Sequence, residues 1–366
     1  MRYDIRTVGA HPDHWYPLAW SDEIKPGKVI GRQFAGQPIA LFRSADGVLS
    51  ALEDRCAHRQ VPLHLGVVCG DTLKCGYHGW SYNSGGACVD VPYLGESRLP
   101  NGVKSYPVRE ISGMVLVFPG APHLAEARLP AFPGQAANPA YRTRRLNREV
   151  ACHYSFLHEN LFDMNHQFLH RKNMGSIKAR CLGRRNGESW CEVDYTFSRT
   201  EGRQSVGEAA ILSAMRPGDG RKFRDLMTIR TEYPYQHLKV WVGEAGEPAL
   251  DVWLCYTPLD ADQRRNRTFG FLSVKTSRIP GLTALAWPFI AWFTERIFKE
   301  DKVIVEAEQR AHDQQGADWN HEVFPAINDL RALLVRCGSP PSSQTLSQPL
   351  SQTQASGTSL PRSARS

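Results

Sequence analysis

Short apolar runs alternate with turn residues along the first third of the chain. The pair Asp46-Gly47 and the triplet Ser84-Gly85-Gly86 stand between such runs. This spacing is typical of a small all-β domain rather than of alternating strands and helices. We expect strands at residues 28–34, 38–43, 48–53, 87–91 and 114–118.

The pattern changes beyond residues 120–139, a stretch rich in Pro and Ala that we interpret as an interdomain connection. Residues 154–170 lack Gly and Pro and predict one helix. A longer helix is expected over 283–314, bent at Pro288 because proline cannot donate to the helical hydrogen-bond ladder, and a last helix over 324–336. Apolar runs between these helices predict strands at 190–198, 226–233, 237–243, 250–257 and 268–275.

Strands followed by a helix-rich end indicate an α+β fold, and a length of 366 residues suits two domains. We expect an all-β domain over residues 1–120 and a mixed domain over residues 121–338. Residues 339–366 are rich in Ser, Gln and Pro and hold almost no apolar anchors, so this tail should be disordered.

Charge and composition narrow the function classes. The chain has 44 Lys+Arg against 37 Asp+Glu, a net charge of +7, but no run of five basic residues, so nothing indicates a nucleic-acid partner. The N-terminus lacks the pattern of a signal peptide, which predicts a cytoplasmic protein whose nine cysteines are free or metal-bound. The longest apolar stretch, 279–293, is shorter than the about 20 residues of a bilayer span. It predicts a buried helix or a pocket wall, with peripheral membrane contact as the alternative.

The strongest chemical signal is a pair of loops that each contribute one cysteine and one histidine. The four residues are Cys56, His58, Cys75 and His78. Two thiolates and two imidazoles can bind a tetrahedral zinc, or a [2Fe–2S] cluster with both cysteines on one iron and both histidines on the other. A zinc finger usually has both cysteines in one loop and both histidines on a helix, so the mixed loops favour the Rieske-type cluster.

A second set of candidate metal ligands lies on the helix expected at 154–170. Asp163, His166 and His170 fall within about 60° of one another on a helix of 3.6 residues per turn. They form either a polar stripe on a buried helix or part of a metal site. A mononuclear Fe(II) that activates O2 is usually held by two His and one carboxylate. Glu300 and Asp301 are the candidates for that carboxylate, and spacing alone does not decide between them.

The sequence resembles the oxygenase (alpha) subunits of the Rieske non-haem iron oxygenases. The segment CAHR…CGYHGWSYNSGGACVDVP is similar to their Rieske domain, ENLFDMNH to their iron-binding helix, and KEDKVIVEA to the segment that supplies the carboxylate. Single-subunit members are the most similar, namely the vanillate and dicamba O-demethylases and the pheophorbide and chlorophyllide a oxygenases. The resemblance implies a Rieske [2Fe–2S] domain followed by a helix-grip, START-like catalytic domain with an antiparallel sheet.

The same resemblance assigns roles to individual residues. It implies that His166, His170 and Asp301 bind the iron, that Asp163 is the aspartate bridging the two metal sites, and that Asn160 lies beside the iron. Two departures from the family pattern stand out. Three residues separate the two histidines, where these enzymes commonly have four, and no CxxC follows near the C-terminus.

The expected function is that of a terminal oxygenase component. It would use O2 to hydroxylate or oxidatively dealkylate a small apolar ring compound, and the alternative is a Rieske electron carrier without oxygenase activity. Since no GxGxxG opens a helix, electrons should come from a separate ferredoxin or flavin reductase. The family resemblance also implies a homotrimer in which His78 of one chain lies beside Asp163 of the next.

Overall fold

The computed structural model describes residues 4–94, 99, 102–129, 133–201, 226–242, 246–277 and 279–340, with side chains as far as residue 198 in the fourth range. Most of the predicted disordered tail, from residue 341 onwards, lies outside the described residues. Ser339, at the predicted start of that tail, forms a bridge with Gly9 and thereby brings the chain back to its own beginning.

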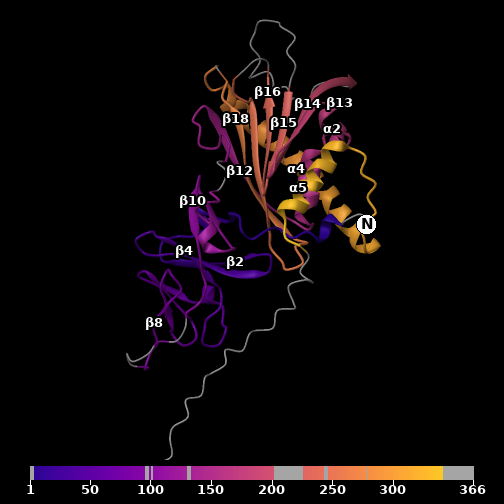
Figure 1. Ribbon diagram of the computed structural model, residues 1–366. Helices are drawn as coiled ribbons and strands as arrows, with labels where there is room; N and C mark the ends of the chain where they lie inside the picture. Colours follow the sequence, from indigo (N-terminus) through magenta and orange to yellow (C-terminus); the bar gives the residue numbers. More distant parts are fainter. Residues whose placement is uncertain are drawn as a thin grey trace, which may run out of the picture.

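The first part of the chain is all β, as expected (Figure 1). It contains three small antiparallel sheets. The strands are β1 (Tyr16–Trp20), β11 (Met114–Val117) and β10 (Val108–Ile111) in one sheet; β2 (Lys28–Phe34), β3 (Gln37–Arg43), β4 (Leu49–Glu53) and β9 (Ser105–Tyr106) in the second; and β5 (Val67–Cys69), β6 (Thr72–Lys74), β7 (Ser81–Tyr82) and β8 (Cys88–Asp90) in the third.

The second part is built on one antiparallel sheet of seven strands, in the order β12-β18-β17-β16-β15-β14-β13. The strands that come first and last along the chain, β12 and β18, are neighbours in this sheet. Their pairing runs from the pair Tyr141 and Lys275 to the pair Val150 and Asn266. The strands are β12 (Tyr141–Val150), β13 (Ser176–Asn186), β14 (Trp190–Glu201), β15 (Leu226–Glu232), β16 (Tyr235–Trp241), β17 (Leu250–Pro258) and β18 (Asn266–Lys275). All five strands predicted for this part are confirmed.

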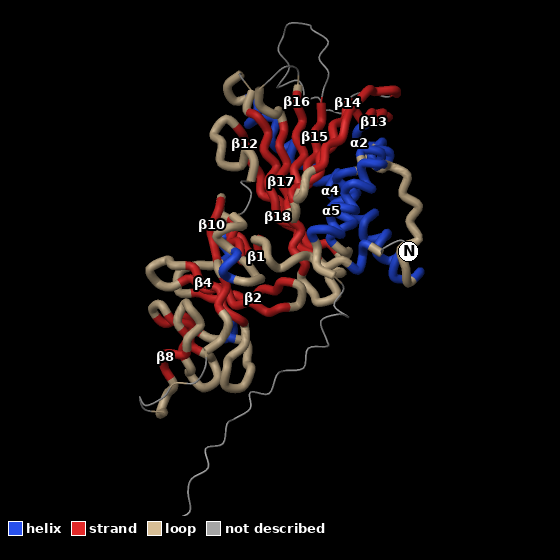
Figure 2. The backbone as a smooth tube through the Cα atoms, in the orientation of Figure 1, coloured by secondary structure: helices blue, strands red, loops and turns tan. Residues whose placement is uncertain are grey.

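The helices gather on one side of this sheet (Figure 2). Two of them confirm the sequence predictions almost to the residue, α4 (Leu282–Gln315), which contains Pro288, and α5 (Pro325–Cys337). An antiparallel sheet that packs against a long C-terminal helix is the expected helix-grip layout. None of the helices in the described part of the chain has the length and hydropathy of a membrane span.

The single helix predicted over residues 154–170 is wrong. The structure has α1 (Tyr154–Phe162), the 3-10 turn η5 (Met164–Phe168) and the short helix α2 (Arg171–Met174). The break falls at Asp163, whose backbone is extended, with φ −92° and ψ 99°. Its side chain accepts a hydrogen bond from the backbone N–H of Asn165 at 2.8 Å. An aspartate that caps the following turn in this way competes with continuation of the helix.

Strand β12 was not predicted because basic residues occupy its helix-facing positions. Arg144 and Arg148 alternate there with the buried Leu146 and Val150. Both guanidinium groups pair with Glu295 of α4, Arg148 at 3.0 Å. The positive charge of these arginines, which made the segment unlike a strand in the sequence, is therefore neutralised by a glutamate of a helix far along the chain.

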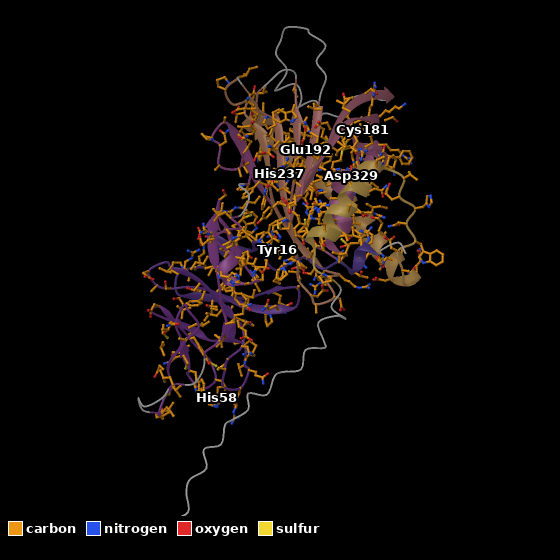
Figure 3. The ribbon with its side chains drawn as sticks, viewed as in Figure 1. Tyr16, His58, Cys181, Glu192, His237 and Asp329 are labelled. Carbon is orange, nitrogen blue, oxygen red and sulfur yellow. The ribbon has the colours of Figure 1, made fainter. Side chains whose placement is uncertain are left out.

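One continuous core joins the two parts of the chain. Tyr16, labelled at their junction in Figure 3, is fully buried in the same cluster as the seven-stranded sheet. The Tyr235 hydroxyl donates to the carbonyl of Trp15 at 2.7 Å, and Thr257 donates to the carbonyl of Pro17 at 2.8 Å. A second, smaller core lies around β6, β7 and the cysteine loops. The N-terminal domain is thus attached to the sheet by β1 and supports its loops separately.

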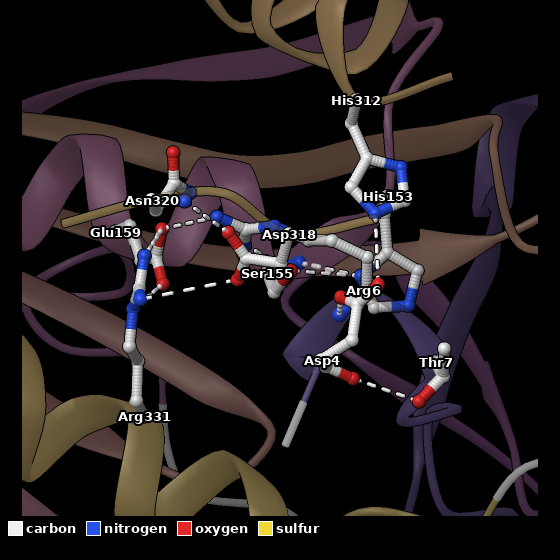
Figure 4. A network of polar contacts seen from close by, with 10 residues as sticks. All are labelled: Asp4, Arg6, Thr7, His153, Ser155, Glu159, His312, Asp318, Asn320 and Arg331. Carbon is white, nitrogen blue, oxygen red and sulfur yellow. Dashed lines mark hydrogen bonds and ion pairs between the residues drawn. The ribbon is translucent and has the colours of Figure 1, made fainter. Parts of the chain in front are cut away.

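The first residues of the chain hold α1 in place (Figure 4). The Arg6 guanidinium is buried and donates to Ser155 Oγ at 2.5 Å and to Glu159 Oε2 at 2.6 Å. Arg331 of α5 donates to the other carboxylate oxygen of Glu159 at 2.6 Å. Asp4 pairs with His312 near the end of α4 at 3.0 Å. The helix that leads into the predicted iron ligands is therefore tied to the N-terminal residues and to α5, and the N-terminal residues are tied in turn to α4.

Candidate metal centres

The first set of predicted ligands lies on two loops that share one backbone hydrogen-bond pattern. In each loop the N–H of the fourth residue after the cysteine donates to the cysteine carbonyl, from Gln60 to Cys56 at 2.9 Å and from Gly79 to Cys75 at 3.1 Å. Both closing residues have positive φ, 61° at Gln60 and 75° at Gly79, a conformation that glycine adopts most easily. A Cβ on Gly76 would lie 2.8 Å from a neighbouring carbonyl oxygen, which explains the glycine directly after Cys75.

The four side chains divide into a buried pair and an exposed pair. The thiols of Cys56 and Cys75 are buried, whereas His58 and His78 are exposed, with ring centroids 4.6 Å apart. Burial raises the pKa of the Cys75 thiol, so a thiolate here needs cationic charge beside it. The irons of a [2Fe–2S] cluster supply such charge, and two thiolates with two imidazoles are the donor set of a Rieske centre. The residues present therefore fit this cluster.

Two aromatic side chains complete these loops. The Trp80 ring is stacked on the His58 ring, with centroids 4.7 Å apart. The Tyr82 hydroxyl lies 3.2 Å from Cys56 Sγ and accepts a hydrogen bond from the Ala57 N–H at 3.0 Å. Sequence reasoning missed Tyr82. Tyr82 lies two residues after Trp80, and side chains two apart on a strand share a face. This spacing is the signal in the sequence that would have placed Tyr82 beside the loops.

The second set converges from η5, which carries His166, from the N-cap of α2, which is His170, and from α4, which carries Asp301. Asp301 Oδ1 lies 3.1 Å from His170 Nε2 and 3.6 Å from His166 Nε2. One donor atom from each residue lies within 4.8 Å of the others. His170 Nε2 is buried, and although the Asp301 carboxylate lies beside it, the two do not meet in hydrogen-bond geometry. A buried nitrogen without a partner is costly unless a metal binds it, so the three side chains fit a mononuclear iron.

Glu300, the other candidate carboxylate, contacts the far side of His170. Its Oε2 accepts from His170 Nδ1 at 2.8 Å, and its Oε1 accepts from Asn173 Nδ2 of α2 at 2.6 Å. Burial lowers the pKa of His170, but the carboxylates of Asp301 and Glu300 outweigh burial and raise it. The two neighbouring acids thus contact opposite nitrogens of one imidazole, and sequence reasoning missed this role of Glu300.

Asp163 and Asn160 lie beside this set. Asn160 Nδ2 is 3.5 Å from Asp301 Oδ1. The carboxylate of Asp163 accepts from the backbone and side chain of Asn165, and it is the Asp163 carbonyl that contacts His166 Nδ1. Within one chain the break in the helix thus turns the Asp163 carbonyl, and not its side chain, towards the imidazole of His166. Asp163 as a whole is partly exposed.

The two sets are not brought together within one chain. His58 lies at the end of the N-terminal domain that points away from the seven-stranded sheet (Figure 3). The second set lies between that sheet and the helices. A cavity of about 40 Å³ adjoins Asp301, lined by apolar residues and by polar groups of α1 and α4. The lining residues are Leu146, Arg148, Val150, Leu157, Asn160, Leu161, Leu254, Tyr256, Thr268, Phe298, Asp301 and Lys302.

Comparison with known proteins agrees with this arrangement. The Rieske [2Fe-2S] domain family matches residues 14–107, and the vanillate O-demethylase oxygenase C-terminal domain family matches residues 150–331. The 4beta-methylsterol monooxygenase of Methylococcus capsulatus is 30% identical over 346 residues, which cover 91% of this chain and 89% of that protein. The oxygenase component of dicamba O-demethylase from Stenotrophomonas maltophilia is 40% identical over 162 residues, 43% of this chain and 47% of that protein.

Solved structures extend the similarity to the whole fold. Dicamba monooxygenase bound to dicamba superposes with a TM-score of 0.71 at 26% identity, covering 90% of this chain and 97% of that one. The same enzyme with non-heme iron and dicamba gives a TM-score of 0.66 at 25% identity, covering 90% and 96%. An all-β domain with Rieske-type loops, followed by a sheet whose covering helices carry two histidines and an aspartate, defines a class of two-centre iron enzymes.

The chain belongs to the Rieske non-haem iron oxygenases. It is a terminal oxygenase component with a Rieske [2Fe–2S] cluster and a mononuclear iron, and the alternative of an electron carrier without oxygenase activity is not supported. Such a component requires a partner that donates electrons and a small organic substrate.

Proposed function

We propose that the enzyme hydroxylates a C–H bond, foremost that of a methyl group, on a neutral, apolar ring compound. The reaction balances as R–H + O2 + 2 e⁻ + 2 H⁺ → R–OH + H2O, with the electrons supplied singly by a ferredoxin or flavin reductase. In this proposal Cys56, His58, Cys75 and His78 hold the cluster. The mononuclear iron is held by a separate triad: His166, His170 and Asp301.

The inner face of the sheet, the face that packs against α1 and α4, carries the proposal about the substrate. Leu254 of this face lines the cavity beside Asp301. Side chains two positions apart on a strand share a face, as do directly paired residues. By this rule the inner face of β16, β17 and β18 continues away from the metal through Leu238, Val240, Leu250, Val252, Leu272 and Val274, and it meets Arg144 and Arg142 at the edge strand β12. A neutral apolar ring system would be complementary to this surface. The similarity to a 4beta-methylsterol monooxygenase, which extends over 91% of this chain, supports the same substrate class.

Oxidative demethylation of an aromatic acid is the second candidate. Arg148 and Lys302 also line the cavity beside Asp301, and they could pair with a substrate carboxylate. Arg148 is already engaged with Glu295 at 3.0 Å, and Lys302 lies 3.7 Å from Glu306. An acidic substrate would have to compete with these ion pairs, and for this reason we rank it second to the neutral compound.

The residues around the two metal centres have separate tasks in this proposal. The metal centres, when bound, supply one-electron transfer and O2 activation. The exposed imidazoles of His58 and His78 form the surface through which electrons pass. Glu300 orients His170, and Asn160 lies next to the carboxylate of Asp301. The apolar inner face excludes water and presents the substrate carbon towards the iron.

We also propose a homotrimer in which electrons cross between chains. His58 lies at the end of its domain remote from the sheet (Figure 3), and Asp163 is a partly exposed residue. A head-to-tail contact can close into a three-fold ring. In that ring His78 of one chain would lie beside Asp163 of the next.

The test of the function is turnover with a ferredoxin and its reductase. Metal analysis should give about three irons and two sulfides per chain, one cluster plus one mononuclear site. A panel should contrast methylated polycyclic alcohols and hydrocarbons with methoxybenzoic acids under ¹⁸O2. A labelled hydroxyl in the neutral compounds is the expected product. Turnover of the acids alone would overturn the neutral-substrate proposal, and turnover of neither class would overturn both candidates.

A further inference from the structure

The first turns of α4 present an apolar stripe to solvent. From Ile279 to Thr294 the sequence contains no charged residue. Three large apolar side chains in this stretch are exposed, Leu285 by 75%, Phe289 by 57% and Trp292 by 59%. At about 100° per residue they fall within an arc of about 60° on one side of the helix.

The same arc becomes basic in the next two turns. Arg296 and Lys299 extend the stripe of Leu285, Phe289 and Trp292, and both are exposed. The Arg296 guanidinium lies 5.6 Å from the centroid of the Trp292 ring. The acid of this region, Glu295, falls outside the arc and is held by Arg144 and Arg148 of β12. The stripe therefore joins an apolar half to a cationic half without an acidic side chain.

The fold does not use this stripe to pack α4. The opposite side of the helix is buried against the sheet, through residues that include Thr283, Ile290 and Phe293. Single exposed apolar residues are ordinary on protein surfaces. A tryptophan, a phenylalanine and a leucine in one row, next to arginine and lysine, are what helices that lie in a membrane interface present to lipid.

We propose that this stripe docks the enzyme onto the surface of an anionic lipid bilayer. Leu285, Phe289 and Trp292 would enter the boundary between headgroups and acyl chains, with Arg296 and Lys299 on the phosphates. A second copy of the chain would bury the apolar half but offers no acidic groups in the same stripe to match the cations. Lipid phosphate matches them, and for that reason we assign the stripe to lipid.

Docking would also serve the proposed chemistry. Phe298, Asp301 and Lys302 on the same helix line the cavity beside the metal, so α4 links the lipid surface to the active site. An apolar substrate concentrates in the bilayer, which gives the contact a purpose. Only this purpose rests on the proposed substrate class, since binding to lipid is measured without substrate or turnover.

Vesicle sedimentation tests the proposal with the intact protein. Wild type should bind vesicles of equal parts phosphatidylcholine and phosphatidylglycerol, and bind pure phosphatidylcholine at least about tenfold more weakly. The triple variant Leu285→Ser, Phe289→Ser, Trp292→Ser should lose at least about tenfold in affinity. Arg296→Gln with Lys299→Gln should weaken binding and flatten its salt dependence. Trp319→Ser, which removes a tryptophan 77% exposed on another segment, is the matched control and should bind as wild type.

A second measurement covers the case in which the triple variant does not fold. Brominated lipids should quench part of the wild-type tryptophan fluorescence, and this part should disappear in the conservative variant Trp292→Phe. Equal binding to both lipids, unchanged binding of a folded triple variant, or quenching retained in Trp292→Phe would overturn the proposal. So would light scattering in which the triple variant changes the oligomer mass, because the stripe would then lie between copies of the chain.

Discussion

At the scale of single residues, the two adjacent acids of α4 have separate tasks. Asp301 faces the Nε2 atoms of both histidines, whereas Glu300 accepts from His170 Nδ1 at 2.8 Å. Such outer contacts orient a metal-binding imidazole and raise its basicity. The contact with Asn173 also ties Glu300 to α2, which stabilises His170 at the shortened spacing from His166.

We expect Glu300→Ala to weaken iron binding by about 10- to 100-fold, because the His170 imidazole loses the carboxylate that orients it. Glu300→Gln should lose less, because its amide oxygen can still accept from His170 Nδ1. The measurement is Fe(II) retention against a chelator under anaerobic conditions, with the visible Rieske spectrum as internal reference. Glu295→Ala is the control on the same helix, since it contacts Arg144 and Arg148 instead. Unchanged iron retention in Glu300→Ala would contradict this role.

Asp301→Ala should remove the mononuclear iron altogether and leave the Rieske spectrum intact. Two neutral imidazoles remain, and without the carboxylate they lack the charge and the third donor that hold Fe(II). Metal analysis should fall from about three irons per chain to two, with sulfide unchanged. Retention of three irons would show that another group supplies the carboxylate.

At the scale of elements, α1 depends on contacts from both ends of the chain. Arg6→Met should lower the free energy of unfolding by on the order of 3 kcal/mol, because it leaves the largely buried Glu159 carboxylate with Arg331 as its remaining charge partner. Urea denaturation measures the loss. Arg55→Met breaks the more exposed pair with Glu53 and should change stability by no more than about 0.5 kcal/mol. Equal effects of the two substitutions would count against the anchoring role.

The same helix makes the protein sensitive to acid. Burial lowers the pKa of His158 to about 3, and burial with the charge of Arg6 lowers that of His153 to about 3, from 6.5. Both imidazoles are neutral in the folded protein, so between these values the unfolded chain binds more protons. Each histidine should therefore lower stability by about 1.4 kcal/mol per pH unit as the pH falls below 6.5. Urea denaturation from pH 8 to 5 tests this. His158→Gln should flatten the profile and His123→Gln, at an exposed site, should not; an identical slope in His158→Gln would refute it.

At the scale of the whole molecule, the proposed homotrimer would bring the two metal sites together across a contact between chains. Chains that lack the Rieske iron (His78→Ala), mixed with chains that lack the mononuclear iron (His166→Ala), should regain part of the turnover, because a mixed ring contains intact cross-chain pairs. Asp163→Asn should keep both metals but nearly abolish oxidation of the reduced cluster by O2 and substrate. Mass photometry confirms mixing. No rescue in demonstrably mixed trimers, or a fully active monomer, would exclude the cross-chain route.

The sequence by itself determined whatever depends on neighbours along the chain. The two Cys–His loops are local turns, closed by their own backbone hydrogen bonds at Gln60 and Gly79, so the loop sequences carry the signal for the cluster. Strands such as Lys28–Phe34 and the helix Leu282–Gln315 follow from local hydrophobic periodicity and lie where the pattern predicts them.

Only the tertiary structure decided what depends on partners far apart in sequence. Whether Asp301 or Glu300 faces the two Nε2 atoms depends on how α4 is rotated against α1, and adjacent residues on a helix differ by about 100°. The break at Asp163 is the exception, since the capping contact with Asn165 is local, but hydrophobic periodicity does not show whether an aspartate caps a new turn or continues the helix. The basic strand β12 pairs with β18, and its arginines on the helix side are neutralised by Glu295 of the distant helix α4. The rotation of α4 and the place of β12 depend on contacts between residues far apart in sequence. Local hydrophobic periodicity carries no information about those contacts.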